Sequence, residues 1–212
     1  MNSTERIFQD LREQIINGTY PPSFSLTETD LAKTYDVSRN TIKKCLMMLE
    51  SEGLVSIEHN KSAKVRSYSI DEVMAFLDLR EVLEGFIIRN AIQSITQEQI
   101  QELEGLMEEM KVLMERRDLL GYSRCNQQFH KVIYDACTNQ PAVEMTIRLK
   151  NQMRKYNSKT ILIPGRDTSS YEEHARILET IKERDVESAE LCMRLHIRNV
   201  RKTFQDNFSL LF

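Results

Sequence analysis

The sequence predicts a mainly α-helical protein in two parts, a small N-terminal part with a short hairpin and a C-terminal bundle of about six helices. Glycine and proline are scarce, at 6 and 4 of 212 residues. The second half is rich in Leu, Met, Glu, Gln, Lys and Arg, which all favour helices. Near residue 68 the pattern changes from short mixed elements to helix after helix. We therefore expect one domain at 1–68 and a second at 69–212.

Composition narrows the classes of function. The formal net charge is −3, which argues against a globally basic protein but leaves room for a local basic patch. Four cysteines without CxxC spacing are typical of buried thiols in a reducing cytoplasm. The first residues are polar, and no apolar run approaches the roughly 20 residues that span a membrane. We therefore expect a cytoplasmic protein that does not enter a membrane.

The first 68 residues predict three helices followed by a hairpin. We expect the first helix to be capped by Ser3 or Thr4 and ended by Gly18, with a loop at "PPSFS". Thr27 caps a second, short helix, and Ser38 caps a third. "LVSIEH" and "AKVRSY" alternate as two strands joined by "NKS". This order is the winged helix-turn-helix pattern, in which the second helix of the pair reads DNA.

The outward face of the reading helix carries side chains that suit DNA. Arginine and asparagine are the types that read guanine and adenine edges, and cations suit phosphate contact. From Arg39 to Arg66, six basic residues against three acidic ones give a local charge of +3. A solvated basic face in a protein-contact domain is the alternative. The candidate DNA contacts are Ser38, Arg39, Asn40, Thr41, Lys43, Lys44, Lys61 and Lys64.

Several spaced motifs lie within residues 6–66: the Gly18 turn, "LTETDLA", "VSRNTIKKCL", and "LESEGLV" leading into the wing. Together they resemble the DNA-binding domain of the GntR family of bacterial repressors. The resemblance implies that Arg39 and the lysines of "TIKK" approach DNA, with the wing in the minor groove. Departures from the family pattern affect the expected operator and wing geometry more than the fold. They are Ser23, Thr29, Asn60 and Ala63.

Residues 69–212 predict an antiparallel helical bundle with short links. Thr96 and Gln99 form a capping box, and Pro141 suits the start of a helix. We expect "ILIPGRDTSS" to be a loop, and the "ERR" and "EE" runs to be solvated faces. The expected helices are 70–93, 96–116, 118–138, 140–160, 168–183 and 185–208.

Three of the four histidines are predicted to face the interior of this bundle from three different helices. His130, His174 and His196 each lie on an apolar stripe, whereas His59 falls in the wing region. One buried imidazole is most simply a satisfied core residue, because it must hydrogen-bond when desolvated. Three imidazoles plus one oxygen suit zinc or nickel. Asn126, one turn before His130, offers that oxygen, although an amide binds a metal more weakly than a carboxylate.

Arg80 is a second polar residue on an apolar face. A guanidinium in such a position needs an anion. The anion is either Glu84, four residues later on the same helix, or a bound ligand, and the sequence leaves both open. Arg154 and Asn199 are weaker candidates for the same ligand pocket.

"LREVLEGFIIRNAI", "NQQFHKVIYDACTNQ" and "YEEHARILETIKERDVESAELCMRLHI" resemble the FCD ligand-binding domain of FadR-type GntR regulators, over roughly 70–208. The resemblance implies a helical bundle that binds a metal through three histidines and an acidic residue, which is asparagine in this sequence. The positions that match are Asn126, His130, His174 and His196. It also implies that Arg80 faces the pocket and meets a small carboxylate.

We therefore expect a transcription regulator that binds a palindromic operator as a homodimer, because two-fold symmetry brings two reading helices to half-sites about one turn apart. A small organic acid in the metal-containing helical domain would modulate operator binding. The resemblance favours repression over activation. A metal sensor is the first alternative. A three-histidine metalloenzyme is another, but we do not expect an enzyme because no general base or nucleophile motif is visible.

Overall fold

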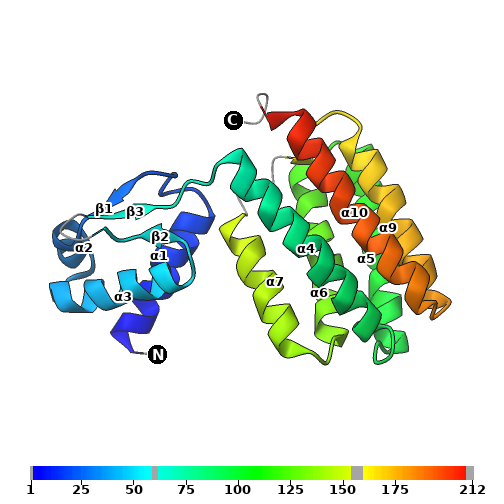
Figure 1. Cartoon of the computed structure of the whole chain (residues 1–212), viewed down its shortest axis with the longest axis horizontal. Coiled ribbons are helices and arrows are strands. Elements are labelled where there is room, and N and C mark those ends of the chain that lie inside the picture. Colours follow the sequence, from blue (N-terminus) through cyan, green and yellow to red (C-terminus); the bar gives the residue numbers. More distant parts are fainter. Residues whose placement is uncertain (1, 59–61, 154–159, 209–212) are drawn as a thin grey trace. The chain divides into compact units, whose positions relative to one another are not determined.

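The computed structural model describes residues 2–58, 62–153 and 160–208, which form two compact units (Figure 1). The N-terminal unit runs to Ser69 and also includes residues 151–153, and the C-terminal unit begins at Ile70. Helices dominate both units, so the predicted mainly α fold is confirmed. Within the described ranges, no helix combines the length and the apolar character needed to cross a membrane.

The N-terminal unit packs three helices and a small sheet around one hydrophobic core. The helices are α1 (Ser3–Ile16), α2 (Glu28–Tyr35) and α3 (Arg39–Ser51), and α3 contacts both of the others. The apolar stripe of each helix faces inward, as the spacing of its apolar residues predicts. The most buried members of this core are Ile7, Leu11, Ile42, Cys45 and Leu49.

Side-chain caps begin each of these helices. Thr27 and Ser38 cap α2 and α3 as predicted, each accepting from a backbone N–H in the first turn. The predicted cap of α1 was wrong. Asn2, rather than Ser3 or Thr4, accepts a backbone N–H at 2.8 Å through its side-chain oxygen. Asparagine caps a helix as well as serine does, so the helix begins slightly earlier than its hydroxyl residues indicate.

The sheet of the N-terminal unit has three short antiparallel strands. They are β1 (Ser25–Leu26), β2 (Val55–Ser56) and β3 (Ala63–Val65), in the order β1-β3-β2. The predicted hairpin corresponds to β2 and β3, and the first two residues of its "NKS" turn lie outside the described residues. The sequence missed β1: Ser25, expected in a loop, pairs with Lys64 of β3.

The C-terminal unit contains six described helices in the predicted order. The fifth begins two residues earlier than expected, so "GRDTSS" is mostly helix rather than loop. The fourth is described to Gln152, and the rest of the span expected to reach 160 lies largely outside the described residues. The helices are α4 (Ile70–Ala91), α5 (Gln97–Glu115), α6 (Leu119–Ala136), α7 (Gln140–Gln152), α9 (Arg166–Lys182) and α10 (Val186–Asp206).

The helices of the C-terminal unit pack closely around a common interior. The first helix, α4, packs along the last, α10, while α5 packs on α6 and α9. Gly85 permits the α4–α10 approach, because a Cβ atom there would lie 2.7 Å from Cγ of Arg194. The predicted capping box of Thr96 and Gln99 begins α5. Since α4 also contacts α6 and α10 contacts α9, these four helices enclose a common interior.

Candidate functional site

The predicted DNA-contacting residues lie on and around the first turns of α3. The side chain of Ser38 caps α3, accepting from the backbone N–H of Thr41, which is half-buried. On β3, Lys64 is exposed, whereas Lys61 lies outside the described residues. The exposed members of the predicted set are Ser38, Arg39, Asn40, Lys43, Lys44 and Lys64.

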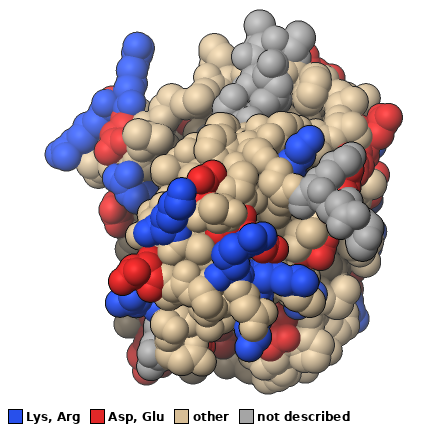
Figure 2. Space-filling model, turned by 90° about the vertical axis from the view of Figure 1, so that its left-hand side faces the viewer, with Lys and Arg blue, Asp and Glu red and all other residues tan. Residues whose placement is uncertain are grey.

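A hollow of about 680 Å³ lies in front of this helix, between α2, α3 and the wing strands. Its lining includes Arg39 and Lys43. A guanidinium nitrogen of Arg39 lies 3.2 Å from Glu28, but its side chain is 68% exposed, and such surface pairs contribute little. Figure 2, seen from the side on which Figure 1 draws this unit, shows basic side chains interspersed with acidic ones. The surface is therefore not uniformly positive, but an exposed basic side chain such as Arg39 is free to leave its weak acidic partner for a phosphate.

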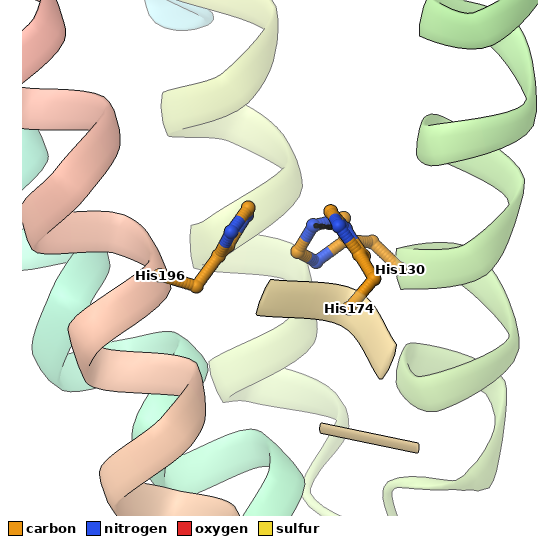
Figure 3. Close-up of side chains that lie close together, drawn as sticks. All are labelled: His130, His174 and His196. Carbon is orange, nitrogen blue, oxygen red and sulfur yellow. Dashed lines mark hydrogen bonds between the residues drawn. The ribbon is translucent and has the colours of Figure 1, made fainter. Parts of the chain in front are cut away.

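The three predicted histidines come together inside the C-terminal unit. His130 from α6, His174 from α9 and His196 from α10 each offer a ring nitrogen, and these atoms lie within 4.8 Å of one another (Figure 3). All three residues are at least 98% buried. The rings of Phe129 and His174 pack edge to face, with their centroids 4.8 Å apart. The apolar stripes that predicted burial of each histidine therefore also make the three converge.

Each imidazole has a partner at Nδ1. His174 donates from Nδ1 to the carbonyl oxygen of Ser170 at 2.6 Å, and His196 donates to Oε2 of Glu173 at 2.7 Å. His130 Nδ1 lies 2.9 Å from Oε2 of Glu84, at an angle outside hydrogen-bond geometry, so this contact is chiefly electrostatic. The acceptors behind His174 and His196 place their ring protons on Nδ1, whereas no hydrogen bond at Nδ1 fixes the tautomer of His130 among the described residues.

The ring nitrogens opposite these contacts are the candidate metal donors. Burial lowers the pKa of His130 and His174 to about 3 and that of His196 to about 4, so the rings are neutral at pH 7. A neutral ring protonated at Nδ1 presents a lone pair at Nε2. Nε2 of His130 and Nε2 of His174 are 3.4 Å apart. Two nitrogens bound tetrahedrally to zinc at ~2.0–2.1 Å lie about 3.3–3.4 Å apart, so this pair fits a divalent metal, and a ring nitrogen of His196 lies within 4.8 Å of the other two histidines.

A buried ion pair supports His196. Glu173 accepts two hydrogen bonds from the guanidinium of Arg166, at 3.0 and 2.8 Å, and one from Asn199 at 2.9 Å. Burial alone would raise the pKa of Glu173, but the hydrogen bonds from His196 and Arg166 lower it to about 2. Glu173 was wrongly expected on a solvated face and Arg166 in a loop. The only sequence signal was the position of Glu173 one residue before His174.

A second buried ion pair lies on the α4 side. Arg80 hydrogen-bonds Glu84, which is the internal partner that the sequence left open. Burial opposes ionisation of Glu84, yet Arg80 and His130 hold its pKa well below the usual range. Lys150 of α7 donates to the hydroxyl of Tyr134 at 3.0 Å, and burial lowers the pKa of Lys150 to about 8. Sequence reasoning missed Lys150, because it reads as an ordinary cation in the last turn of a helix.

The remaining predicted site residues are less engaged. Asn126 lies one turn before His130 and is half-buried, and in the described part of the chain its side chain forms no hydrogen bond with the three histidines. Asn199 contacts Glu173 rather than a ring nitrogen. Arg154 lies outside the described residues. The structure therefore brings together three histidines and two carboxylates, and Asn126 lies one turn before His130 on the same helix.

Comparison with known proteins gives two family matches. Residues 3–65 match the bacterial regulatory proteins of the gntR family, and residues 75–199 match the FCD domain. The gluconate operon transcriptional repressor of Bacillus licheniformis is 27% identical over 174 residues, covering 82% of this chain and 70% of that protein.

Two solved structures share the fold. E. coli McbR/YncC aligns with a TM-score of 0.75 at 21% identity, covering 100% of this chain and 97% of that chain. The metal-free FCD domain of TM0439 aligns with a TM-score of 0.55 at 17% identity, covering 68% of this chain and 99% of that chain.

Proposed function

Because this chain belongs to the GntR family of bacterial regulators with a C-terminal FCD domain, we propose that it is a repressor whose operator binding responds to a small carboxylate held beside a metal. Its family consists of DNA-binding transcription regulators and not of enzymes. The exposed cations of α3 suit DNA binding by such a regulator, and the buried histidines suit binding of the metal and effector. The gluconate operon repressor, named for a carboxylate, supports both repression and the effector class.

The convergence of three buried ring nitrogens carries this proposal. His130, His174 and His196 would hold a divalent ion, zinc or nickel, with Asn126 as a weak fourth donor. Such an ion supplies a positive centre that attracts a carboxylate. Arg80, Arg154 and Asn199 remain the proposed effector contacts.

A homodimer would present two copies of α3 to a palindromic operator. Support comes from α4, where three large apolar side chains at i, i+3 and i+7 share one exposed face. Leu79, Val82 and Phe86 are 44%, 53% and 43% exposed, and a second copy of the chain would cover them. Effector binding would change the spacing of the two reading helices, and the protein would act in the cytoplasm, where its operator lies.

Operator binding with and without metal tests the proposal. Fluorescence anisotropy on DNA from beside the protein's own gene would be measured in zinc, in chelator, and with a panel of small carboxylates. We expect a carboxylate to release DNA from the zinc-loaded protein. Release or binding driven by zinc alone would instead establish the metal-sensor alternative. Operator affinity that responds to neither metal nor carboxylate would refute the proposed input.

A further inference from the structure

We propose that Glu84 of α4 and Glu173 of α9 are positioning residues for the metal site: they hold His130 and His196 with the proton on Nδ1, so that both Nε2 lone pairs face the ion. This inference rests on the metal site of the proposed function and assigns two carboxylates that do not themselves touch the ion. Carboxylates behind histidine ligands commonly fix ring orientation and strengthen the ligand in this way.

The placement of Glu84 supports this role. Its side chain is fully buried, and its two oxygens face different groups. Oε1 accepts from Nε of Arg80, and Oε2 lies 2.9 Å from Nδ1 of His130. Arg80 therefore fixes one oxygen of the carboxylate, while the other lies beside the ring of His130, and the hydroxyl of Tyr134 also contacts this carboxylate.

Glu173 occupies the corresponding place behind His196. Oε2 accepts from Nδ1 of His196 at 2.7 Å, while Arg166 and Asn199 satisfy the remaining lone pairs. The guanidinium of Arg166 makes a two-pronged contact, which holds the carboxylate in one orientation. The side chain of Glu173 is about nine-tenths buried, so water cannot replace it as the acceptor at Nδ1.

The two carboxylates act as a set with the third histidine. Nδ1 of His174 donates to the carbonyl of Ser170 and Nδ1 of His196 to Glu173, while a carboxylate oxygen of Glu84 lies 2.9 Å behind Nδ1 of His130. Without such an acceptor, a neutral imidazole can place its proton on Nε2 and block the ion. Each glutamate is paired with an arginine, so the buried charges cancel before the ion arrives. The arrangement therefore preorganises three lone pairs without an excess of buried charge.

A simpler role for both glutamates would be to neutralise two buried arginines. Glu81 provides a matched control for that role. It lies on α4 close to Glu84, it is also buried, and it pairs with Arg194 and Arg198. It has no contact with a histidine in the described part of the chain. A glutamate that serves only its arginines should behave like Glu81 when zinc is added.

Zinc affinity, measured on the full chain by competition with a chelating dye, separates the two roles. Glu84→Gln and Glu173→Gln should each weaken zinc binding about 10-fold, and Glu81→Gln should leave it within twofold. The double variant Arg80→Met with Glu84→Leu removes both buried charges together, which protects the fold, and should weaken binding by about 100-fold. Folded Glu84 variants with the affinity of the unaltered protein would overturn the inference.

The ring tautomer gives a second readout that needs no metal. The chain has only four histidines, so the nitrogen-15 NMR spectrum of metal-free protein can be assigned. His130 should be protonated at Nδ1 in the unaltered protein and should lose that preference in the double variant. If the unaltered protein takes up no zinc, the metal site of the proposed function is refuted. The spectrum alone then decides whether Glu84 fixes the tautomer of His130. The same tautomer in both proteins would overturn the role of Glu84.

Discussion

The two units carry their candidate functions in opposite ways. In the N-terminal unit the functional side chains are exposed and largely independent: the side chain of Arg39 is 68% exposed and has one weak partner. In the C-terminal unit they are buried and interlocked: His174 is fully buried and contacts groups from two other helices. Exposed cations act additively, whereas a buried donor set works only when it is complete. Substitutions in the two units should therefore differ in kind as well as in size.

The largest effect should follow removal of one buried ligand. For His174→Ala we expect complete loss of stabilisation by zinc, because two imidazoles do not hold the ion as three do. At a zinc concentration of ~100 times Kd, the unaltered protein should gain about 2.7 kcal/mol, measured by thermal unfolding. Met193→Ala is the control: it opens a cavity in α10 and costs about 2–5 kcal/mol, but should keep the zinc increment. A zinc increment retained in His174→Ala would remove the contrast between the units.

Exposed cations should give smaller, additive losses. Arg39→Ala and Lys43→Ala should each weaken operator binding, by about 1–3 kcal/mol where the side chain contacts a base and less where it contacts phosphate. Their double variant should come within about 0.5 kcal/mol of the sum, because an i, i+4 pair on an exposed helix face couples by no more than this. Anisotropy titrations at several salt concentrations measure both values. Lys111→Ala on α5 is the control and should have no effect, and strong non-additivity would contradict the comparison.

A gain of function should be possible at the edge of the buried cluster. Asn126→Asp offers an anionic oxygen one turn before His130, so zinc affinity should rise about tenfold, since carboxylates are stronger zinc ligands than amides. The dye competition assay measures the change, and Asn126→Ala shows what the amide itself contributes. An aspartate that leaves zinc affinity unaltered would place residue 126 outside the metal's reach.

The last effect concerns the stability of the fold rather than zinc or DNA binding, and it follows from packing around the buried site. Gly85→Ala should destabilise the C-terminal unit by about 1–3 kcal/mol, because its Cβ would meet Arg194 at 2.7 Å. Gly105→Ala on α5 is the matched control: no atom lies within 4 Å of its Cβ, so alanine should stabilise the helix by about 0.5–1 kcal/mol. Urea unfolding measures both. Equal responses at the two glycines would show that the α4–α10 approach is less tight than the structure indicates.

The sequence predicted most of the fold because its signals are local. Caps such as Thr27, Ser38 and Thr96 define helix starts within three residues, and apolar spacing defines the buried stripes. The two-residue strand β1 escaped detection because it depends on pairing with β3, which lies far along the chain. Asn2 was overlooked because two hydroxyl residues follow it.

The candidate site was predicted only in part, for the same reason. The three histidines lie on apolar stripes, and a polar residue in such a stripe can be recognised from the sequence. Glu173 lies among charged residues and looks solvated until Arg166 and His196 are placed beside it. Glu84 was visible as a partner for Arg80 but not for His130, because the second contact joins two helices. Local sequence patterns thus identify the side chains that face a core. The partners of these side chains on other helices can be identified only from the structure.

The packing of α4 along α10 has a consequence for the order in which the protein is made. Glu84 emerges with the first helix of the C-terminal unit, but His196 arrives with the last, and α4 has its main packing partner only then. During synthesis the growing chain can form the complete DNA-reading unit while the histidine cluster still lacks one member. Until α10 is released, the face of α4 that packs on α10 stays uncovered, and exposed apolar surface of this kind makes a nascent chain prone to aggregation.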